Sequence, residues 1–174
     1  PTGVALSPAG EIYVSDGYGN ARVHKFSPEG ELLLSWGEPG AGPGQFRLVH
    51  SVWLDKEQRV WVCDRENNRI QIFDTHGKYL NQWTGLLRPT EIFIDNEGTV
   101  YVSELSQRVS IFSNDGKLLA RWGNREKDPW KALFVAPHTI SVDSRGDIYI
   151  GEVAMTIGKI DRGSRVVRKF LRKG

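Results

Sequence analysis

This sequence of 174 residues has few cysteines and a small net charge, and each of these features limits the possible structures and partners. Cys63 is the single cysteine, so an intramolecular disulfide is excluded and the redox compartment stays open. The formal net charge is only +2, which is too small to indicate a nucleic-acid partner by itself. No apolar run approaches the ~18 residues of a membrane span, so we expect no membrane partner.

A secretory signal is also missing, but the sequence begins at Pro1, without methionine and already inside a repeat. We therefore expect the natural N-terminus, with any signal, to lie upstream of Pro1. A secreted or periplasmic location is compatible with the sequence, which leaves the compartment unknown. Hydrophobic residues make up 39% and charged residues 25%, a balance typical of one globular domain.

Four copies of one unit run along the whole chain. They begin near residues 1, 49, 89 and 137, with offsets of 48, 40 and 48 residues (49 − 1, 89 − 49, 137 − 89). This period lies in the ~40–50-residue range of propeller blades. We expect a single propeller region over residues 1–174, with blades at about 1–48, 49–88, 89–136 and 137–174.

Each copy reads as four short strands. The first strand is apolar and we expect both of its faces to be buried, while the second is rich in aromatic and β-branched residues. The third strand alternates apolar and polar residues, which favours one buried face. The fourth strand carries Trp36, Trp83 and Trp122 in three copies, and we expect residues 167–170, with Phe170, to match it in the last copy. Glycines mark the turns, except that Gln58 replaces one of them in the second copy.

These units predict an all-β fold, a β-propeller of four-stranded blades that surround a central channel. Four blades are present, and we expect them to be part of a six-bladed ring. In such a fold the first strand lines the axis. The loop that leads into it and the loop between the second and third strands then open on the same face.

Two histidines occupy the same position in different copies. His50 and His138 each stand at the start of a first strand, where the other two copies have Thr2 and Thr90. We call these four residues the leading positions. Histidines in alternate blades of a six-bladed ring would lie about 120° apart, so three of them could hold one metal ion with an open position. Only two are present here, and we expect the third ligand outside the supplied sequence.

Several segments resemble NHL-repeat propellers, and in particular the bacterial relatives of the peptidyl-α-hydroxyglycine α-amidating lyases. The resemblance is carried by Tyr-Val-Ser-Asp-Gly-Tyr-Gly-Asn at residues 13–20, Gly-Pro-Gly-Gln-Phe at 42–46 and Asp-Arg-Glu-Asn-Asn-Arg-Ile-Gln at 64–71. It is dense up to about Phe73 and thinner afterwards, although the four-copy register continues to the end of the chain.

This resemblance implies a zinc-dependent carbon–nitrogen lyase that acts on a small peptide-like substrate and releases a peptide amide and glyoxylate. His50 and His138 match two of the family's three zinc ligands, and Tyr18 and Arg65 match its catalytic tyrosine and arginine. Tyr18 would take a proton from the substrate, and Arg65 would bind the terminal carboxylate through two hydrogen bonds. We expect no other cofactor at these residues.

Some positions depart from the family pattern. Thr139 follows His138 where the animal enzymes have aspartate, which argues against a structural Ca²⁺ ion there. Gly19 stands at one of the disulfide cysteine positions of those enzymes. The third histidine and a further family arginine belong to an upstream region that this sequence does not contain.

Simpler interpretations stand beside each of these residues. His50 and His138 could be loop residues at the start of a strand, Tyr18 could pack over the channel mouth, and Arg65 could support its loop together with Asp64 and Arg69. Cys63 is expected in the core, and the remaining two histidines, His24 and His76, on the surface. The alternative function is a non-enzymatic NHL module that binds protein or RNA, and we favour the enzyme.

Two further functions are disfavoured. A lactonase-like hydrolase would need several axial carboxylates or asparagines, whereas the leading positions here are threonine and histidine. The basic segment at residues 165–173 has no interleaved aromatics suited to base stacking, so we do not expect it to bind nucleic acid.

Overall fold

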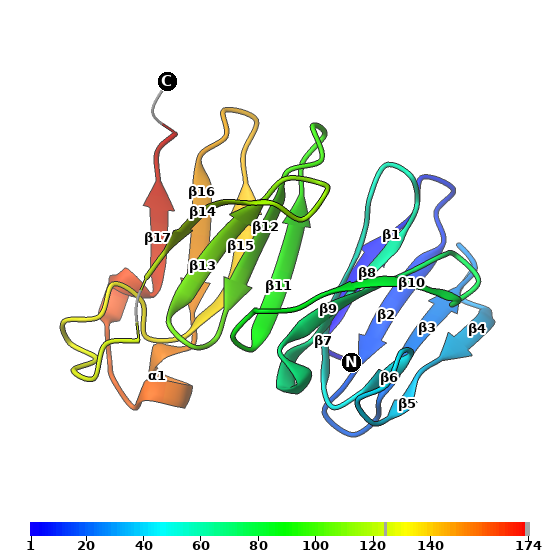
Figure 1. Cartoon of the computed structure of the whole chain (residues 1–174), viewed down its shortest axis with the longest axis horizontal. Coiled ribbons are helices and arrows are strands. Elements are labelled where there is room, and N and C mark those ends of the chain that lie inside the picture. The colour runs from blue at the N-terminus through cyan, green and yellow to red at the C-terminus, as the bar shows by residue number, and fades with distance from the viewer. Residues whose placement is uncertain (124, 173–174) are drawn as a thin grey trace. The chain divides into compact units, whose positions relative to one another are not determined.

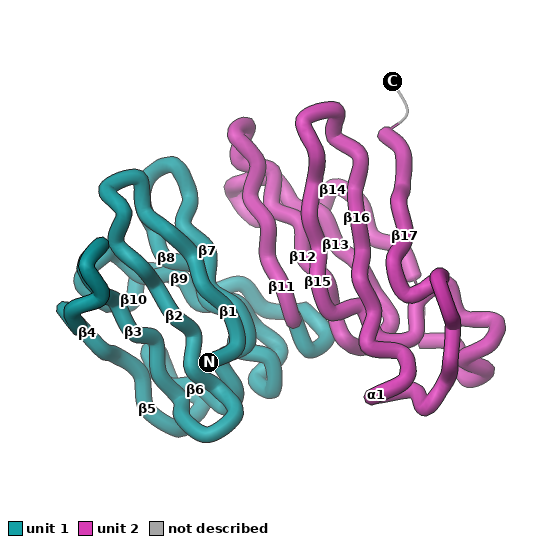
Figure 2. Tube along the Cα trace, turned by 180° about the vertical axis from the view of Figure 1, so that it is seen from behind, with its two compact units in different colours: residues 1–89 teal, residues 90–174 magenta. Residues whose placement is uncertain are grey.

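The computed structural model of the chain describes residues 1–123 and 125–172. These residues form antiparallel sheets of short strands, so the all-β prediction is confirmed (Figure 1). The chain divides into two compact units, residues 1–89 and 90–174, which Figure 2 draws in teal and magenta. Each unit contains two large sheets, and each sheet corresponds to one copy of the sequence repeat.

The first unit holds two four-stranded meanders in which neighbouring strands are consecutive in the chain. The strands of its first sheet are β1 (Gly3–Leu6), β2 (Ile12–Asp16), β3 (Arg22–Phe26) and β4 (Leu32–Trp36). The strands of its second sheet are β7 (Val49–Leu54), β8 (Val60–Asp64), β9 (Arg69–Phe73) and β10 (Tyr79–Trp83). A short parallel pair, β5 (Glu38–Pro39) and β6 (Gln45–Phe46), lies in the connection between the sheets.

The core of the first unit forms between its two sheets, because β1 and β2 pack against β7. Tyr13 and Val23 from the first sheet meet Val52 and Phe73 from the second in one buried cluster, together with Phe46 of the connection. The aromatic and β-branched residues that predicted strands are therefore the same residues that join the sheets.

In the second unit the first sheet is again a four-stranded meander. Its strands are β11 (Pro89–Ile94), β12 (Val100–Glu104), β13 (Arg108–Phe112) and β14 (Leu118–Trp122). The other sheet has three strands among the described residues: β15 (Pro137–Val142), β16 (Ile148–Glu152) and β17 (Val167–Phe170). Val109, Phe134, Ile140 and Ile150 form the core between them.

The assignment of residues 167–170 to a fourth strand was wrong. β17 pairs directly with β16, with Phe170 opposite Ile148, just as Phe26 of the third strand β3 lies opposite Ile12. It is therefore the third strand of its sheet. The short helices α1 (Ala154–Gly158) and η2 (Gly163–Val166) take up the long connection before it, which displaced the repeat from its expected register.

The expectation that first strands are buried on both faces was wrong for β1. Its exposure alternates, and Val4 and Leu6 are 63% and 65% exposed. In contrast, Val49 and Val52 of β7 are buried, because the first sheet covers them. An apolar composition alone did not distinguish a strand with one covered face from a strand with two.

The predicted turn at Gln58 is confirmed. Gln58 has φ +59° and its amide donates to the carbonyl of Asp55, which is the same geometry that Gly98 and Gly146 adopt after Asp95 and Asp143. A side chain is therefore present where the other copies have glycine, in a backbone region that disfavours it.

No helix among residues 1–123 and 125–172 is long and apolar enough to cross a membrane.

Candidate functional site

A buried ion pair shapes the loop that carries Arg65. The Asp64 carboxylate accepts hydrogen bonds from the Arg69 Nε at 2.8 Å, from the Asn67 side-chain amide at 2.7 Å and from the Arg47 backbone amide at 3.0 Å. Asp64 is fully buried, so these partners compensate for its loss of hydration. The expected Asp64–Arg69 support of the loop is confirmed, and Arg65 stands outside this pair.

Arg65 instead faces Tyr18, which lies on the loop between β2 and β3. Its Nη1 donates to the Tyr18 Oη at 3.3 Å, and its guanidinium carbon lies 5.6 Å from the centre of the Tyr18 ring. The backbone amide of Arg65 donates to the carbonyl of Leu48 at 2.9 Å. Arg65 is therefore held against the segment that leads into β7.

His50 completes this group from the start of β7. The Tyr18 Oη lies 3.5 Å from the His50 Nε2, and the two rings meet edge to face with centres 6.0 Å apart. His50 is 4% exposed and Arg65 is 9% exposed, whereas Tyr18 is 67% exposed. The structure thus brings three of the four predicted site residues together. His50 and Arg65 form the buried side of this group, and Tyr18 forms the side that is open to solvent.

Gly17 fixes the distance between the Tyr18 loop and β7. A β-carbon placed on Gly17 would lie 1.8 Å from the carbonyl oxygen of Val49, the residue before His50. No side chain fits there without a shift of one of the two backbones. Gly17 was not predicted as part of the site, although it stands directly before Tyr18 within the motif at residues 13–20.

Glu66 and Arg88 surround Arg65 on its other side. The Glu66 Oε1 accepts hydrogen bonds from the Arg65 Nε at 2.9 Å and from the Arg88 Nη2 at 2.7 Å. Burial acts to raise the pKa of Glu66, but the hydrogen bonds and charges of Arg88 and Arg65 outweigh it and hold the pKa below its usual value. Glu66 therefore stays ionised and orients Arg65. Neither Glu66 nor Arg88 was predicted as part of the site. Their contact joins residues that are 22 positions apart in the chain, which the sequence pattern does not reveal.

His138 belongs to the second unit. It stands in β15, directly after Pro137, and is half-buried. The loop before it is held by Glu152, whose Oε2 accepts hydrogen bonds from the Val135 amide at 2.5 Å and the Ala136 amide at 3.2 Å. Arg162 and Arg168 lie 3.7 and 3.5 Å from the other oxygen of this buried carboxylate. A buried carboxylate therefore holds the loop before each of the two histidines.

Imidazole is the type of side chain in this chain that would suit a zinc ion. Within residues 1–123 and 125–172, no three His, Cys, Asp or Glu side chains form a cluster that could hold a metal ion. His50 and His138 are donors of the kind that zinc prefers, and the Nε2 of His50 faces the open Tyr18 side of the site. Each imidazole fits zinc by its chemistry, and a zinc site would need ligands beyond these two.

The remaining expectations for side chains have clear outcomes. Cys63 is buried in β8, as expected for a core residue. His76 is exposed in its turn. His24 is only partly exposed, and its Nδ1 lies 2.7 Å from the Ser35 hydroxyl.

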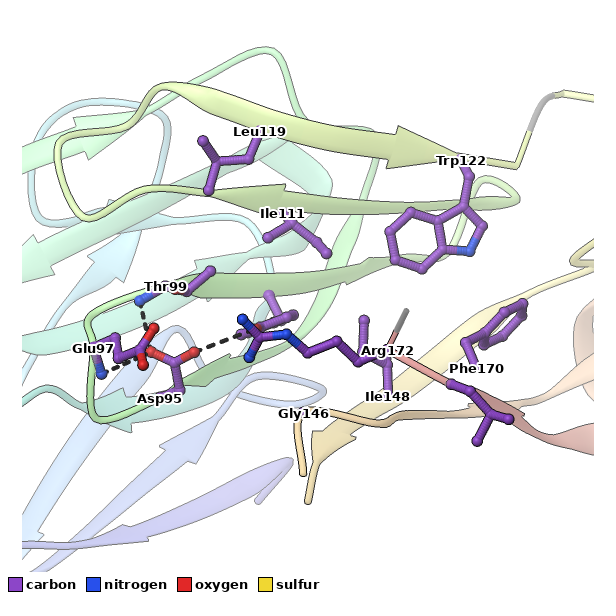
Figure 3. Close-up of a pocket in the computed structure, with 12 residues that line it drawn as sticks. Asp95, Glu97, Thr99, Ile111, Leu119, Trp122, Gly146, Ile148, Phe170 and Arg172 are labelled. Carbon is purple, nitrogen blue, oxygen red and sulfur yellow. Dashed lines mark hydrogen bonds between the residues drawn. The ribbon is translucent and has the colours of Figure 1, made fainter. Parts of the chain in front are cut away.

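Among the cavities that the described residues line, two lie in separate units. One of about 690 Å³ in the first unit is lined by Tyr18 with Arg22, Phe46 and Arg47, although His50 and Arg65 do not border it. Another of about 530 Å³ in the second unit has an apolar floor that includes Trp122 and Phe170 (Figure 3). Figure 3 shows the Arg172 side chain extending towards Asp95 at its rim. None of the predicted site residues lines this second cavity.

Comparison with known families identifies the repeat. The NHL repeat family matches residues 1–26 and 46–73, which include Tyr18, His50 and Arg65.

Several known proteins are similar to about half of the chain or more. The chain is 46% identical to the peptidyl-glycine alpha-amidating monooxygenase of Mus musculus over 171 residues, which is 87% of this chain and 17% of that protein. It is 31% identical to human NHL repeat-containing protein 3 over 180 residues, which is 98% of this chain and 49% of that protein. It is 38% identical to peptidyl-alpha-hydroxyglycine alpha-amidating lyase 1 of Drosophila melanogaster over 99 residues, 49% of this chain and 18% of that protein.

The chain spans about half of the length of these relatives or less. Among solved structures, the WD40 β-propeller domain of Doa1 matches with a TM-score of 0.68 and 15% identity, over 97% of this chain and 49% of that chain. An inactive variant of virginiamycin B lyase from Staphylococcus aureus matches with a TM-score of 0.69 and 16% identity, over 98% of this chain and 55% of that chain. At these identities the likeness shows the β-propeller fold alone.

Proposed function

We propose that this chain, which is an NHL-repeat β-propeller, contributes to a zinc-dependent lyase that cleaves the C–N bond of peptides ending in α-hydroxyglycine. The observation that carries the proposal is the contact of Tyr18 with both His50 and Arg65. The similarity to the amidating lyase of Drosophila melanogaster and to the amidating monooxygenase of Mus musculus supports it. His50 and His138 would hold the zinc ion together with ligands from outside this sequence.

Zinc bound at the histidines would supply a Lewis acid that favours loss of the proton from the substrate hydroxyl. Tyr18 would accept that proton, and its oxygen lies on the open side of the site beside the His50 imidazole. Arg65 is held by Glu66 and by the Leu48 carbonyl, so its cation is fixed where a substrate carboxylate can pair with it.

The bond changes balance without a further reactant. The substrate hydroxyl would lose its proton to the phenolate form of Tyr18, and its oxygen would form the carbonyl of glyoxylate. The electron pair of the C–N bond leaves with the peptide nitrogen, which takes a proton and becomes the terminal amide. Tyr18 can return the proton it received, so the group serves as base and then as acid.

The test is zinc content and lyase activity of the protein that contains this chain in its full natural length. A synthetic peptide that ends in α-hydroxyglycine is the substrate, and released glyoxylate is measured. We expect His50→Ala and His138→Ala to lose zinc and to lower kcat/KM at least about 100-fold. His76→Ala is the matched control, because His76 is exposed in a turn, and it should change neither quantity.

A zinc-free wild-type protein, or unchanged activity in both histidine variants, would rule the lyase out. The second candidate function is then a binding module without catalysis. It is favoured by the similarity to NHL repeat-containing protein 3, which extends over 98% of this chain. Under that function, His50→Ala and Tyr18→Ala should alter binding to a partner protein while zinc has no effect on it.

A further inference from the structure

Each candidate histidine follows a carbonyl group that is bound by a threonine of the preceding sheet. The hydroxyl of Thr2 donates to the carbonyl of Val49 at 2.8 Å, and Val49 directly precedes His50. The hydroxyl of Thr90 donates to the carbonyl of Pro137 at 3.1 Å, and Pro137 directly precedes His138. Both bonds span 47 residues, and each lies within one unit.

A serine accompanies each threonine. Thr2 lies 2.9 Å from the Ser15 hydroxyl, and Thr90 lies 3.0 Å from the Ser103 hydroxyl. Each threonine hydroxyl has one proton and more than one acceptor, since the carbonyl of the same serine lies 3.1 Å from the threonine oxygen in both copies. The carbonyl before the histidine is the nearest acceptor of Thr2, at 2.8 Å, and it is as near to Thr90 as the serine carbonyl, at 3.1 Å. Ser15, Ser103 and Thr90 are all fully buried, so these hydroxyls have no water to replace a lost partner.

A second attachment holds the same segment from the other side. The carboxylate of Asp64 accepts a hydrogen bond from the backbone amide of Arg47, and the carboxylate of Glu152 accepts one from the backbone amide of Val135. Each of these amides belongs to the third residue before a histidine. The backbone ahead of both histidines is thus fixed at two points, by a threonine from the preceding sheet and by a carboxylate from the same sheet.

We infer that Thr2 and Thr90 are positioning residues for His50 and His138. By holding the peptide group before each histidine, the threonine sets the direction in which the imidazole leaves the strand. In metal sites, groups that hydrogen-bond the ligating side chain itself contribute about 10- to 100-fold to metal affinity, and we expect the lower end of that range for a contact to the backbone beside the ligand. This inference rests on the proposed zinc site for its consequence, although the threonine contacts exist independently of the metal.

The test replaces Thr2 with valine, which keeps the branched shape and removes the hydroxyl, and with serine, which keeps the hydroxyl. Ser7→Ala is the matched control. Thr2 lies directly before β1 and Ser7 lies directly after it. The Ser7 hydroxyl accepts a hydrogen bond from the backbone amide of Glu11 at 3.1 Å. Thr2→Val and Ser7→Ala therefore each remove one hydrogen-bonding hydroxyl from the same strand region, and only Thr2 contacts the segment before His50.

Two quantities are measured on the zinc-free and the zinc-loaded protein. The first is amide hydrogen exchange at His50 and Ser51 without zinc. We expect Thr2→Val to speed it at least about tenfold more than Ser7→Ala does. The second is the zinc dissociation constant from competition with a chelating dye. We expect it to rise about 10-fold or more in Thr2→Val, to stay within about threefold of wild type in Thr2→Ser, and to be unchanged in Ser7→Ala. Thr90→Val should act in the same way on His138.

The outcomes separate the two claims. If wild type binds zinc through its histidines but Thr2→Val matches Ser7→Ala in both measurements, the positioning role is wrong and the lyase proposal stands. If wild type binds no zinc, the lyase proposal fails. The rate of amide hydrogen exchange at His50 and Ser51 then still tests whether Thr2 fixes the backbone. Equal exchange rates in Thr2→Val and Ser7→Ala would show that Thr2 does not position His50.

Discussion

The phenol oxygen of Tyr18, on the loop between β2 and β3, lies 3.5 Å from the Nε2 of His50 in β7 of the next sheet. Tyr18 is 67% exposed, whereas His50 is 4% exposed. A polar group at the open edge of the protein is thereby placed beside a buried imidazole, which is an arrangement suited to proton transfer at a bound substrate.

Tyr18→Phe should lower kcat of the proposed lyase about 100-fold or more, because the phenol oxygen that accepts the proton is removed while the ring remains. The midpoint of urea unfolding should not change, since the ring is largely exposed. Glyoxylate release measures the first quantity. Tyr149→Phe is the control, because the Tyr149 hydroxyl bonds to Asp143 and to none of the proposed site residues, and it should leave kcat at the wild-type value.

Gly17→Ala should destabilise the protein by about 1–3 kcal/mol, because the new methyl group meets the Val49 carbonyl and forces two backbones apart. It should also separate Tyr18 from His50. Gly19→Ala is the matched control two residues further on, where a β-carbon would have no atom within 4 Å. Urea unfolding measures the effect, and equal midpoints for the two variants would show that the close approach does not matter.

Gln58→Gly should stabilise the protein by about 1 kcal/mol, because Gln58 adopts φ +59° and glycine has no side chain to oppose that conformation. The reverse change is available at Gly30, which has φ +90° and open space around it. Gly30→Ala should lower the unfolding free energy by a similar amount. A change of the same sign in both variants would contradict this explanation.

Stability should fall as the pH drops from about 4 to about 2, and Asp143 should contribute to that fall. Burial acts to raise the pKa of this carboxyl, but hydrogen bonds from the Asp147 amide, Arg145 and Tyr149 outweigh it and hold the pKa at about 2 instead of 3.8. A lowered pKa in the folded state means that the ionised carboxylate stabilises the fold above pH 3.8, and that this contribution is lost as protonation proceeds towards pH 2.

Asp143→Asn tests this contribution, because the amide oxygen still accepts backbone hydrogen bonds but no longer titrates. Urea midpoints between pH 2 and pH 5 should change less steeply in the variant than in wild type. Parallel profiles for the two proteins would show that Asp143 does not contribute.

Sequence patterns predicted the fold where the repeat is regular. Alternation, aromatic second strands and the turn at Gln58 were all correct, because each depends on residues close together in the chain. The third strand of the last sheet was misplaced because a connection with two short helices separates it from β16. Local pattern does not reveal the length of such a connection.

The site was predicted in part for a similar reason. Tyr18, His50 and Arg65 were recognised from their motifs, and the structure places them in contact. Glu66 and Arg88 were missed, because their pairing depends on how the chain returns 22 residues later. Gly17 was missed because its importance arises from an absent side chain beside Val49, a relationship that only the packed structure displays.

The paired threonines and histidines also bear on how such a chain grows by duplication. Thr2 and Thr90, Ser15 and Ser103, and His50 and His138 are each 88 residues apart (90 − 2, 103 − 15, 138 − 50), which is the length of two blades. A gene duplication that adds two blades at once therefore copies a threonine together with the histidine whose preceding carbonyl it binds. A duplication of a single blade separates them and breaks the alternation. For a protein engineer, the transferable part is the pair of blades.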